Sequence, residues 1–468
     1  MFYVLSSLFS IIFILPTSEK GGVMMRVGLD FGTTNTTAAV YDGERVVLIP
    51  LDPVAPSPAV LRTALFITPE GQQMIGRAAI NAFTEGNVGR EIIYERRLVG
   101  QSTQTYSGVG TVVEDLVAVV DANPPGRLFQ SIKTMLRDPS YVKTDVFGTT
   151  YTLEQLIAKI LREIRRRIEQ HTGQQISAIT VGRPVHYATT PEGDALAVRR
   201  MREACEIAGL PAVDFLPEPV AAAYAYAATQ RERRNILVFD FGGGTLDVTV
   251  MAVDGDQRTV LANDGVPVGG DVLDSRIVTG TLMPYFGEGA RLGPRKLPLP
   301  AMLLEQLNDW QSILELHTPR TLEVIDEAVR TGDKPTQLKA LRALVRENYG
   351  LVLYETVEQA KRLLSSERET VIGMDVSDIH FAHILPRYEF ERLIGPETRA
   401  IGACVDRALT AAGLVPDEID VVLRTGGSSR IPRFVTLLAD RFGAEKLREQ
   451  DPFTSVGAGL AIAAYEQK

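Results

Sequence analysis

Two glycine-rich turns carry the side chains best suited to phosphate chemistry. The first follows an apolar run and reads Asp-Phe-Gly-Thr-Thr-Asn over residues 30–35. The second reads Asp-Phe-Gly-Gly-Gly-Thr-Leu-Asp over residues 240–247. Glycine lets backbone amides close around a phosphate, threonine hydroxyls add donors, and an aspartate can hold water on a bound Mg²⁺. One such turn is compatible with a plain hairpin, but two in one chain favour phosphate binding.

A third glycine-containing turn lies within residues 423–430, Leu-Arg-Thr-Gly-Gly-Ser-Ser-Arg, between a predicted strand and a predicted helix. A helix N-terminus with small residues suits a nucleotide, although Gly-Gly before a helix is a weak signal alone. The sequence has no GxxxxGK[ST] P-loop, and the two DFG triplets lack the HRD loop of protein kinases. These common nucleotide-binding classes are therefore excluded.

The first two turns each join two predicted strands. Residues 26–31 and 36–43 form one pair, and residues 235–241 and 246–255 form the other. Strand, acid, glycine turn and strand in the same order indicate an internal repeat. The sequence therefore predicts two related lobes, each offering one turn.

Helical patterns alternate with strands along the chain, which is typical of an α/β protein. The stretch 300–365 is mostly helical, with breaks near Thr318–Pro319 and Thr331–Pro335, whereas residues 84–127 lack clear periodicity and have the character of an insertion. The other predicted helices cover residues 152–173, 194–210, 218–228, 431–443 and 456–468.

Composition excludes several other functions. The 468 residues are enough for two to four domains, and two cysteines cannot build a disulfide framework or a multi-thiolate metal cluster. His380 and His383 fall on opposite faces of a predicted strand, which argues against a shared metal. A net charge of −9 argues against nucleic-acid binding. We interpret the basic cluster at residues 165–167 as a solvated helix face.

The apolar residues 2–15 are too few for a comfortable membrane span. They resemble the apolar part of a signal peptide, but no Lys or Arg precedes them. We favour an over-extended start, with translation beginning at Met24 or Met25, over a genuine membrane anchor. We therefore expect a cytoplasmic protein, where ATP is abundant.

Seven motifs in order resemble the ATPase domain of the heat-shock protein 70 chaperones. The resemblance runs from about Met25 to the end of the chain. It rests on VGLDFGTTNT, FLPEPVAAAYAYA, ILVFDFGGGTLDVTV, VGGDVLD, EQAKRLLSS, TGGSSRIPR and VGAGLAIAA. It implies an α/β, two-lobed actin-like ATPase fold, with duplicated ribonuclease H-like domains around a nucleotide cleft. The implied divisions are an N-terminal segment 1–23, lobe I 24–230, lobe II 231–447 and a helix 448–468 returning to lobe I.

The resemblance also implies the residues that handle Mg-ATP. Asp30 and Asp240 would hold Mg²⁺ through water. Lys133, in LFQSIKTML, matches the catalytic lysine that faces the γ-phosphate, and Glu218, in PEPVAAA, matches the glutamate that positions the attacking water. Asp240 and Thr245 complete the implied catalytic group. The phosphate-binding residues would be Gly32, Thr33, Thr34, Asn35, Gly242, Gly243, Gly244 and Thr245.

The nucleoside would be held by three further segments, again by resemblance. Within EQAKRLLSS the matching residues are Glu358, Lys361, Arg362 and Ser365. The opposite wall of the adenosine pocket would be Gly426, Gly427, Ser428 and Arg430, and the glycine pair near the ribose would be Gly269 and Gly270. Taken alone, Lys133 has the pattern of a surface lysine, and Glu218 that of a helix-start acid.

The chain departs from the family pattern in several places. It ends at Lys468, where the family normally continues into a peptide-binding β-sandwich, and Phe453 stands where the family usually has an acid. We expect an ATP hydrolase that binds Mg-ATP, forms ADP slowly, lacks the peptide-binding domain and works with a protein partner or co-chaperone. The alternatives are a nucleotide-dependent interaction module with little turnover, a small-molecule kinase of the same superfamily, and a filament former resembling bacterial actins.

Overall fold

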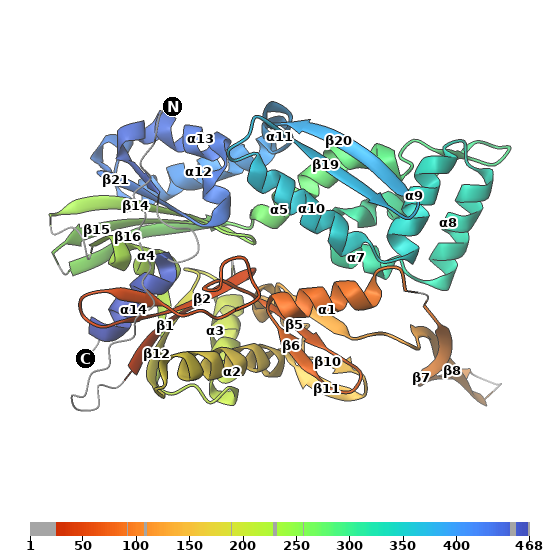
Figure 1. Cartoon of the computed structure of the whole chain (residues 1–468), viewed down its shortest axis with the longest axis horizontal. Helices are drawn as coiled ribbons and strands as arrows, with labels where there is room; N and C mark the ends of the chain where they lie inside the picture. Colours follow the sequence, from red (N-terminus) through yellow and green to blue (C-terminus); the bar gives the residue numbers. More distant parts are fainter. Residues whose placement is uncertain are drawn as a thin grey trace.

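The computed structural model describes residues 25–90, 92–106, 110–188, 190–227, 232–255, 257–449 and 455–466. The apolar segment 2–15, Met24 and Phe453 lie outside these residues. Within the described part, no helix is long and apolar enough to cross a membrane. Two mixed β-sheets lie at the centres of two lobes, lobe I below and lobe II above in Figure 1.

The lobe I sheet has the strand order β13-β12-β1-β2-β3. The central strand β1 runs antiparallel to β2 and parallel to β12, and its residues Val27 and Leu29 are fully buried. A sheet covered on both faces requires such an apolar central strand. The bounds are β1 (Met25–Phe31), β2 (Asn35–Tyr41), β3 (Val46–Leu48), β12 (Ile176–Arg183) and β13 (Val213–Pro217), with β4 (Leu61–Arg62) pairing with β2.

The lobe II sheet repeats this arrangement strand for strand, in the order β22-β21-β14-β15-β16. Its central strand β14 is antiparallel to β15 and parallel to β21, as β1 is to β2 and β12. The internal repeat predicted from the two glycine turns is therefore confirmed at the level of topology. The strands are β14 (Arg234–Phe241), β15 (Leu246–Asp254), β16 (Gln257–Val266), β21 (Val421–Thr425) and β22 (Leu447–Glu449).

Two helices cover the face of the lobe I sheet that points away from lobe II (Figure 1). Helix α2 (Leu153–Thr172) begins at a capping box formed by Thr152 and Gln155 and ends at Gly173, whose φ of 68° is left-handed. Helix α3 (Pro191–Ile207) begins three residues before the predicted position because Thr190 caps it and Pro191 opens it.

Between the two sheets lie α4 (Glu218–Ala227) and α14 (Ser455–Glu466), which pack on each other. A Cβ atom at Gly459 would lie only 1.7 Å from the carbonyl oxygen of Ala221. Helix α14 covers β1, β2 and β12, while α4 contacts β14 and β15. Small residues in both helices therefore allow the lobes to approach closely through one shared layer.

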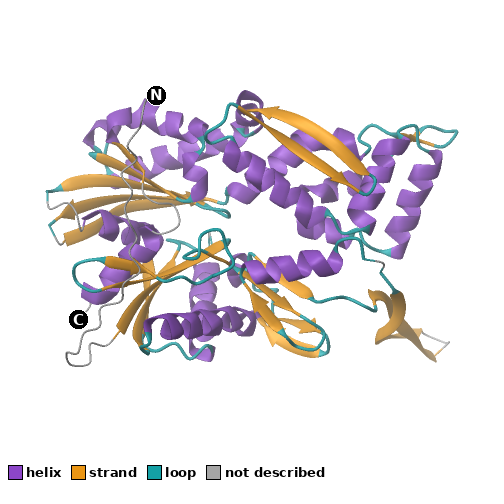
Figure 2. Cartoon of the chain, viewed as in Figure 1, coloured by secondary structure: helices purple, strands orange, loops and turns teal. Residues whose placement is uncertain are grey.

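The remaining helices belong mainly to lobe II (Figure 2). Thr318 caps α8 and Pro335 opens α9, so the predicted breaks in the 300–365 stretch are confirmed. The bounds are α5 (Gly270–Ile277), α6 (Ala301–Glu305), α7 (Trp310–Glu315), α8 (Pro319–Thr331), α9 (Pro335–Arg346), α10 (Gly350–Leu363), α11 (Arg387–Leu393), α12 (Gly395–Ala412) and α13 (Pro432–Phe442).

Further strands form small sheets. His380 and His383 lie in β20 with opposite orientations, His380 outward beside Asp375 and His383 against Tyr285, as the alternation predicts. The strands are β5 (Ala64–Ile67), β6 (Gln73–Ile75), β9 (Arg127–Gln130), β10 (Lys143–Val146), β11 (Thr149–Thr152), β17 (Arg291–Leu292), β18 (Leu297–Pro298), β19 (Glu369–Val376) and β20 (Ile379–Pro386).

The segment 84–127 contains a long hairpin that its sequence pattern does not reveal. After α1 (Arg77–Asn87), strands β7 (Tyr94–Tyr106) and β8 (Gly110–Asp121) pair with each other and stand away from the body in Figure 1. At its base, the Tyr94 hydroxyl lies 2.5 Å from Nδ1 of His317 in lobe II. A ribbon that stands apart needs no apolar face for a core, so period-two alternation is absent.

Candidate functional site

The two predicted phosphate turns face each other across the lobes. A Cβ atom at Gly243 would lie 2.3 Å from the Thr34 hydroxyl, and one at Gly244 would lie 3.6 Å from Thr33. Glycine at position 243 is therefore required by this close approach. The buried Thr34 hydroxyl has no hydrogen-bond partner among the described residues. It is a donor available to a phosphate oxygen.

The second turn rests on the predicted glycine pair. The Gly270 amide donates to the carbonyl of Gly242 at 3.0 Å, and the Asp271 amide donates to Gly243 at 2.9 Å. A Cβ atom at Gly269 would lie 2.1 Å from the Gly243 carbonyl oxygen. The beginning of α5 therefore packs backbone to backbone against the turn.

Lys133 and Glu218 form a buried ion pair in this region. Lys133 lies in the short 3₁₀ helix η1 (Ile132–Arg137), after Ser131 in a left-handed conformation with φ 53°. Its ammonium donates to Oε1 of Glu218 at 2.7 Å, with 7% of the lysine side chain and 15% of the glutamate side chain exposed. Burial works against the ammonium, but the Glu218 carboxylate raises the pKa of Lys133 above its ordinary value. Lys133 is thus a fixed internal cation.

Three aspartates surround this pair, and all have raised pKa values. Burial and the negative charge of Glu218 raise the pKa of Asp30 to about 7, against the opposing effect of Lys133. The same two causes raise the pKa of Asp240. Asp247 was quoted in the turn but given no role from the sequence. Burial raises the pKa of Asp247 to about 7, although the Thr245 hydroxyl donates to it at 3.2 Å.

This group has more acids than cations, which is the environment that favours a divalent cation. Asp30 and Asp240 end the corresponding strands β1 and β14 before the two turns. The residues therefore fit Mg²⁺ held between the lobes. Within the described residues, no three His, Cys, Asp or Glu side chains converge closely enough to bind a metal ion directly. The role predicted for the two aspartates is through water.

Lys361, predicted to hold the nucleoside, is buried on α10. Its ammonium donates to the Gly270 carbonyl at 2.8 Å and to Oδ2 of Asp274 at 2.6 Å. Ser428 reaches the same place and donates to the Gly242 carbonyl at 3.1 Å. A Cβ atom at Gly270 would lie 3.0 Å from both the Lys361 ammonium and the Ser428 hydroxyl. The structure therefore brings the three nucleoside segments together beside the second turn.

Asp274 is a further buried acid that sequence reasoning missed. Burial raises its pKa to about 7, while Lys361 acts in the opposite direction. Its second carboxylate oxygen, Oδ1, has no hydrogen-bond partner among the described residues. The only signal in the sequence was its position one helical turn after Gly270.

The other predicted nucleoside residues lie at the edge of this group. Gly426 has φ 77°, and a Cβ atom there would lie 2.3 Å from the carbonyl of Phe241. Arg430 is 44% exposed and pairs with Glu449 at 2.8 Å. Gly427 and Arg362 are exposed, and Ser365 is half-buried just beyond α10. Their roles stay predictions.

Two ion pairs join lobe I to α10. Arg62 on β4 donates to Glu358 at 3.2 Å, and Arg77 on α1 donates to Glu355 at 2.9 Å. Burial works against the charged form of Glu358, but Arg62 outweighs it, and the pKa of Glu358 lies below its ordinary value. Glu358 is therefore held across the lobes by Arg62, a partner 296 residues away that no local pattern could reveal.

Comparison with known proteins agrees with this geometry. A family model described as Hsp70 protein matches residues 26–288 and 345–465, and residues 289–344 fall between the two matches. The chain is 27% identical over 451 residues to Chaperone protein DnaK of Thermus thermophilus, covering 94% of this chain and 60% of that relative. The chain thus spans about 60% of the length of the curated relative it matches. It belongs to the Hsp70 family and carries that family's two-lobed, actin-like ATPase domain.

Proposed function

We propose that this protein binds Mg-ATP between its lobes and hydrolyses it slowly to ADP and phosphate. Members of the Hsp70 family are ATPases that bind Mg-ATP. The observation that carries the proposal is the buried Lys133–Glu218 pair, at 2.7 Å, among three aspartates with raised pKa values. A structural ion pair alone does not explain why three further acids are buried around it.

In the proposed reaction, positioning and charge neutralisation supply most of the catalysis. The amides and hydroxyls of the two turns hold the phosphates, with Thr34 and Thr245 donating from opposite lobes. Lys133 faces the γ-phosphate and offsets its charge. Glu218, held by Lys133, orients the attacking water and accepts its proton. Bound Mg²⁺ would supply electrostatic stabilisation of the phosphate oxygens. Asp30 and Asp240 would hold this ion through water.

The nucleoside end of the site supports ATP as the substrate. Lys361, Ser428 and Gly270 meet beside the second phosphate turn, so a ligand reaching both places must carry phosphates and a further polar group. We also infer a cytoplasmic location, where ATP is abundant, and a protein partner or co-chaperone that uses the change in lobe closure.

The proposal is tested by following ADP and inorganic phosphate together, with Mg-ATP as the sole substrate. We expect one phosphate per ADP over many turnovers. ADP formation only when a sugar or polyol is added, without free phosphate, would identify a small-molecule kinase. Tight ATP binding with neither product would identify a nucleotide-gated interaction module and contradict the proposed hydrolysis.

A further inference from the structure

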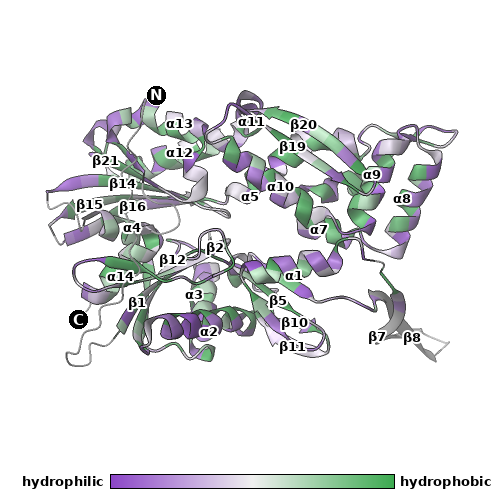
Figure 3. Ribbon diagram, in the orientation of Figure 1, coloured by the Kyte–Doolittle hydropathy of each residue, from purple (hydrophilic) through white to green (hydrophobic). Residues whose placement is uncertain are grey.

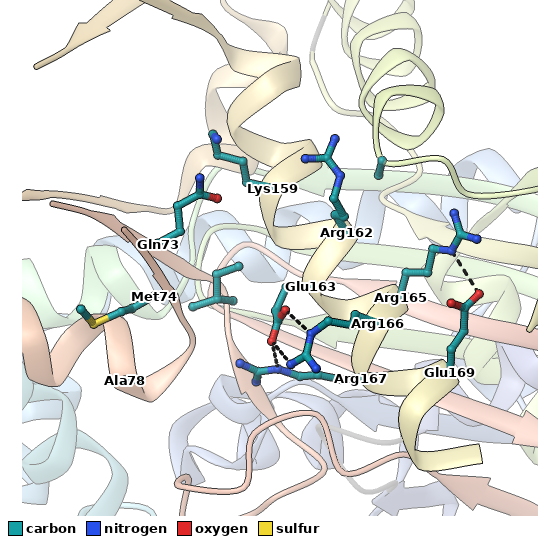
Figure 4. A pocket seen from close by; sticks show the side chains of 12 residues that line it. Gln73, Met74, Ala78, Lys159, Arg162, Glu163, Arg165, Arg166, Arg167 and Glu169 are labelled. Carbon is teal, nitrogen blue, oxygen red and sulfur yellow. Dashed lines mark hydrogen bonds and ion pairs between the residues drawn. The ribbon is translucent and has the colours of Figure 1, made fainter. Parts of the chain in front are cut away.

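A basic hollow lies on the outer side of lobe I, away from the interlobe site. It has a volume of about 690 Å³ and is open on one side. Figure 4 shows α2 along one side and Gln73, Met74 and Ala78, from β6 and the beginning of α1, along the other. We call it the basic groove. Its charged residues are Lys159, Arg162, Glu163, Arg165, Arg166, Arg167 and Glu169.

The charge of the groove is opposite to that of the whole chain. Five cationic side chains and two carboxylates line it, a net excess of three positive charges, whereas the chain carries −9. The apolar face of α2 is buried against the sheet through residues such as Leu156, Ile160 and Ile164. The charged residues therefore occupy its outward face, which is hydrophilic in Figure 3.

Three of the arginines also connect neighbouring segments. Arg162 donates to the carbonyl of Ile207 at 2.9 Å, Arg165 donates to Gly209, and Arg167 donates to Leu51. These bonds fix the guanidinium groups at the wall of the groove. The basic run at residues 165–167 is thus not only a solvated helix face, as its sequence suggested, because its members line one hollow.

Lys159 and Arg166 have a different position. Among the described residues, their polar and ring contacts stay within residues 151–170. The Lys159 ammonium lies 4.6 Å from the centre of the Tyr151 ring, and burial together with the charge of Arg162 lowers its pKa. Arg166 pairs with Glu163 on the same helix and is 59% exposed. Both can exchange these contacts for an external anion without loosening neighbouring elements.

We propose that the basic groove binds an acidic, extended segment of a partner protein. The α2 residues from 159 to 169 span about 15 Å at about 1.5 Å per residue. This length accommodates about four to five residues of extended chain at about 3.3 Å each. Arginine forks bind carboxylates in bidentate pairs. A pocket for a small ligand encloses most of its surface, whereas this hollow is open along one side, as a passing peptide chain requires.

The test measures binding of a fluorescein-labelled hexaglutamate peptide to the full chain at low salt, with and without excess Mg-ADP. We expect saturable binding that weakens with added salt and is unchanged by Mg-ADP, because α2 lies away from the interlobe site. The double variant Lys159→Gln/Arg166→Gln is expected to weaken binding by about tenfold. The matched control, Arg330→Gln/Arg392→Gln, removes two exposed arginines that also pair within their own helices, and should change binding less than about twofold.

Four results would overturn the proposal. They are no saturable binding, equal binding of a hexaglutamine peptide, equal loss in both double variants, or displacement of the peptide by Mg-ADP. Pyrophosphate and a single-stranded oligonucleotide are measured as competitors. If either binds through Lys159 and Arg166 more tightly than hexaglutamate, the groove takes a phosphate ligand, and the assignment to an acidic peptide is wrong.

Discussion

The Lys133 ammonium and the Glu218 carboxylate lie 2.7 Å apart, although 85 residues separate them in the chain. The first comes from η1 in lobe I, and the second is the opening residue of α4, which contacts the lobe II sheet. The pair therefore sits where a change in lobe position alters the surroundings of the bound phosphates. This relationship links the chemistry proposed for the site to movement of the lobes.

The raised pKa of Asp30 predicts a conflict between stability and function. Its ordinary value is 3.8 and its value in the folded protein is about 7. Between these values the folded state binds more protons than the unfolded state. The contribution of Asp30 to stability therefore falls as pH rises from about 4 to about 7 and stays unfavourable above. In nucleotide-free protein, Asp30→Asn should raise the melting temperature at pH 8 but not near pH 4. The same shift at both pH values would contradict this origin.

The contact between α4 and α14 predicts a strict requirement for glycine at position 459. Gly459→Ala places a Cβ atom 1.7 Å from the Ala221 carbonyl oxygen, so the helices must separate. We expect a loss of about 1–3 kcal/mol in the free energy of unfolding by denaturant titration. Gly395→Ala is the control, since its Cβ would find only the end of Arg399, at 3.7 Å. Equal stability of both variants would show that α14 does not pack here as described.

Lys361 and Asp274 predict strong coupling in a double-mutant cycle. Lys361→Met leaves the buried Asp274 carboxylate without its partner at 2.6 Å, which should cost about 3–5 kcal/mol of folding stability. Lys361→Met/Asp274→Leu should recover much of that loss, because neither charge then remains buried. Additive losses in chemical denaturation would indicate that the two side chains act independently. ATP affinity should stay reduced in the double variant if Lys361 also holds the nucleoside.

The two ion pairs between lobe I and α10 predict slower opening of the lobes. Arg62→Ala/Arg77→Ala removes the partners of Glu358 and Glu355, so we expect release of a fluorescent ADP analogue to accelerate by about threefold to tenfold. Added salt should reduce the difference from wild type. Arg45→Ala serves as a control because its pair with Asp42 is local and exposed. Identical release rates in all three proteins would remove these pairs from control of opening.

Local patterns predicted the parts of the fold whose causes are local. The turns at residues 32–35 and 242–245, the capped helix α2 and the breaks around α8 follow from residue type and short spacing. The β7–β8 hairpin was missed because a projecting ribbon carries no periodic apolar face.

Site residues with distant partners could not be found in this way. The roles of Lys133 and Glu218 came only through resemblance to a family, because nothing in either local sequence indicates the other. Arg62, Asp247 and Asp274 were missed for the same reason. Their environment depends on burial and on charges brought from other segments of the chain.

The most direct test of the central claim is ATP hydrolysis by the wild type and Lys133→Ala, in single and multiple turnover, starting the chain at Met25. Nucleotide affinity is measured in parallel, so that loss of chemistry is separated from loss of binding. We predict that both proteins bind Mg-ATP, that the wild type turns over repeatedly, and that Lys133→Ala is slower by about 100-fold or more. Hydrolysis by the variant at the wild-type rate would contradict the assignment of Lys133 and with it the proposed mechanism.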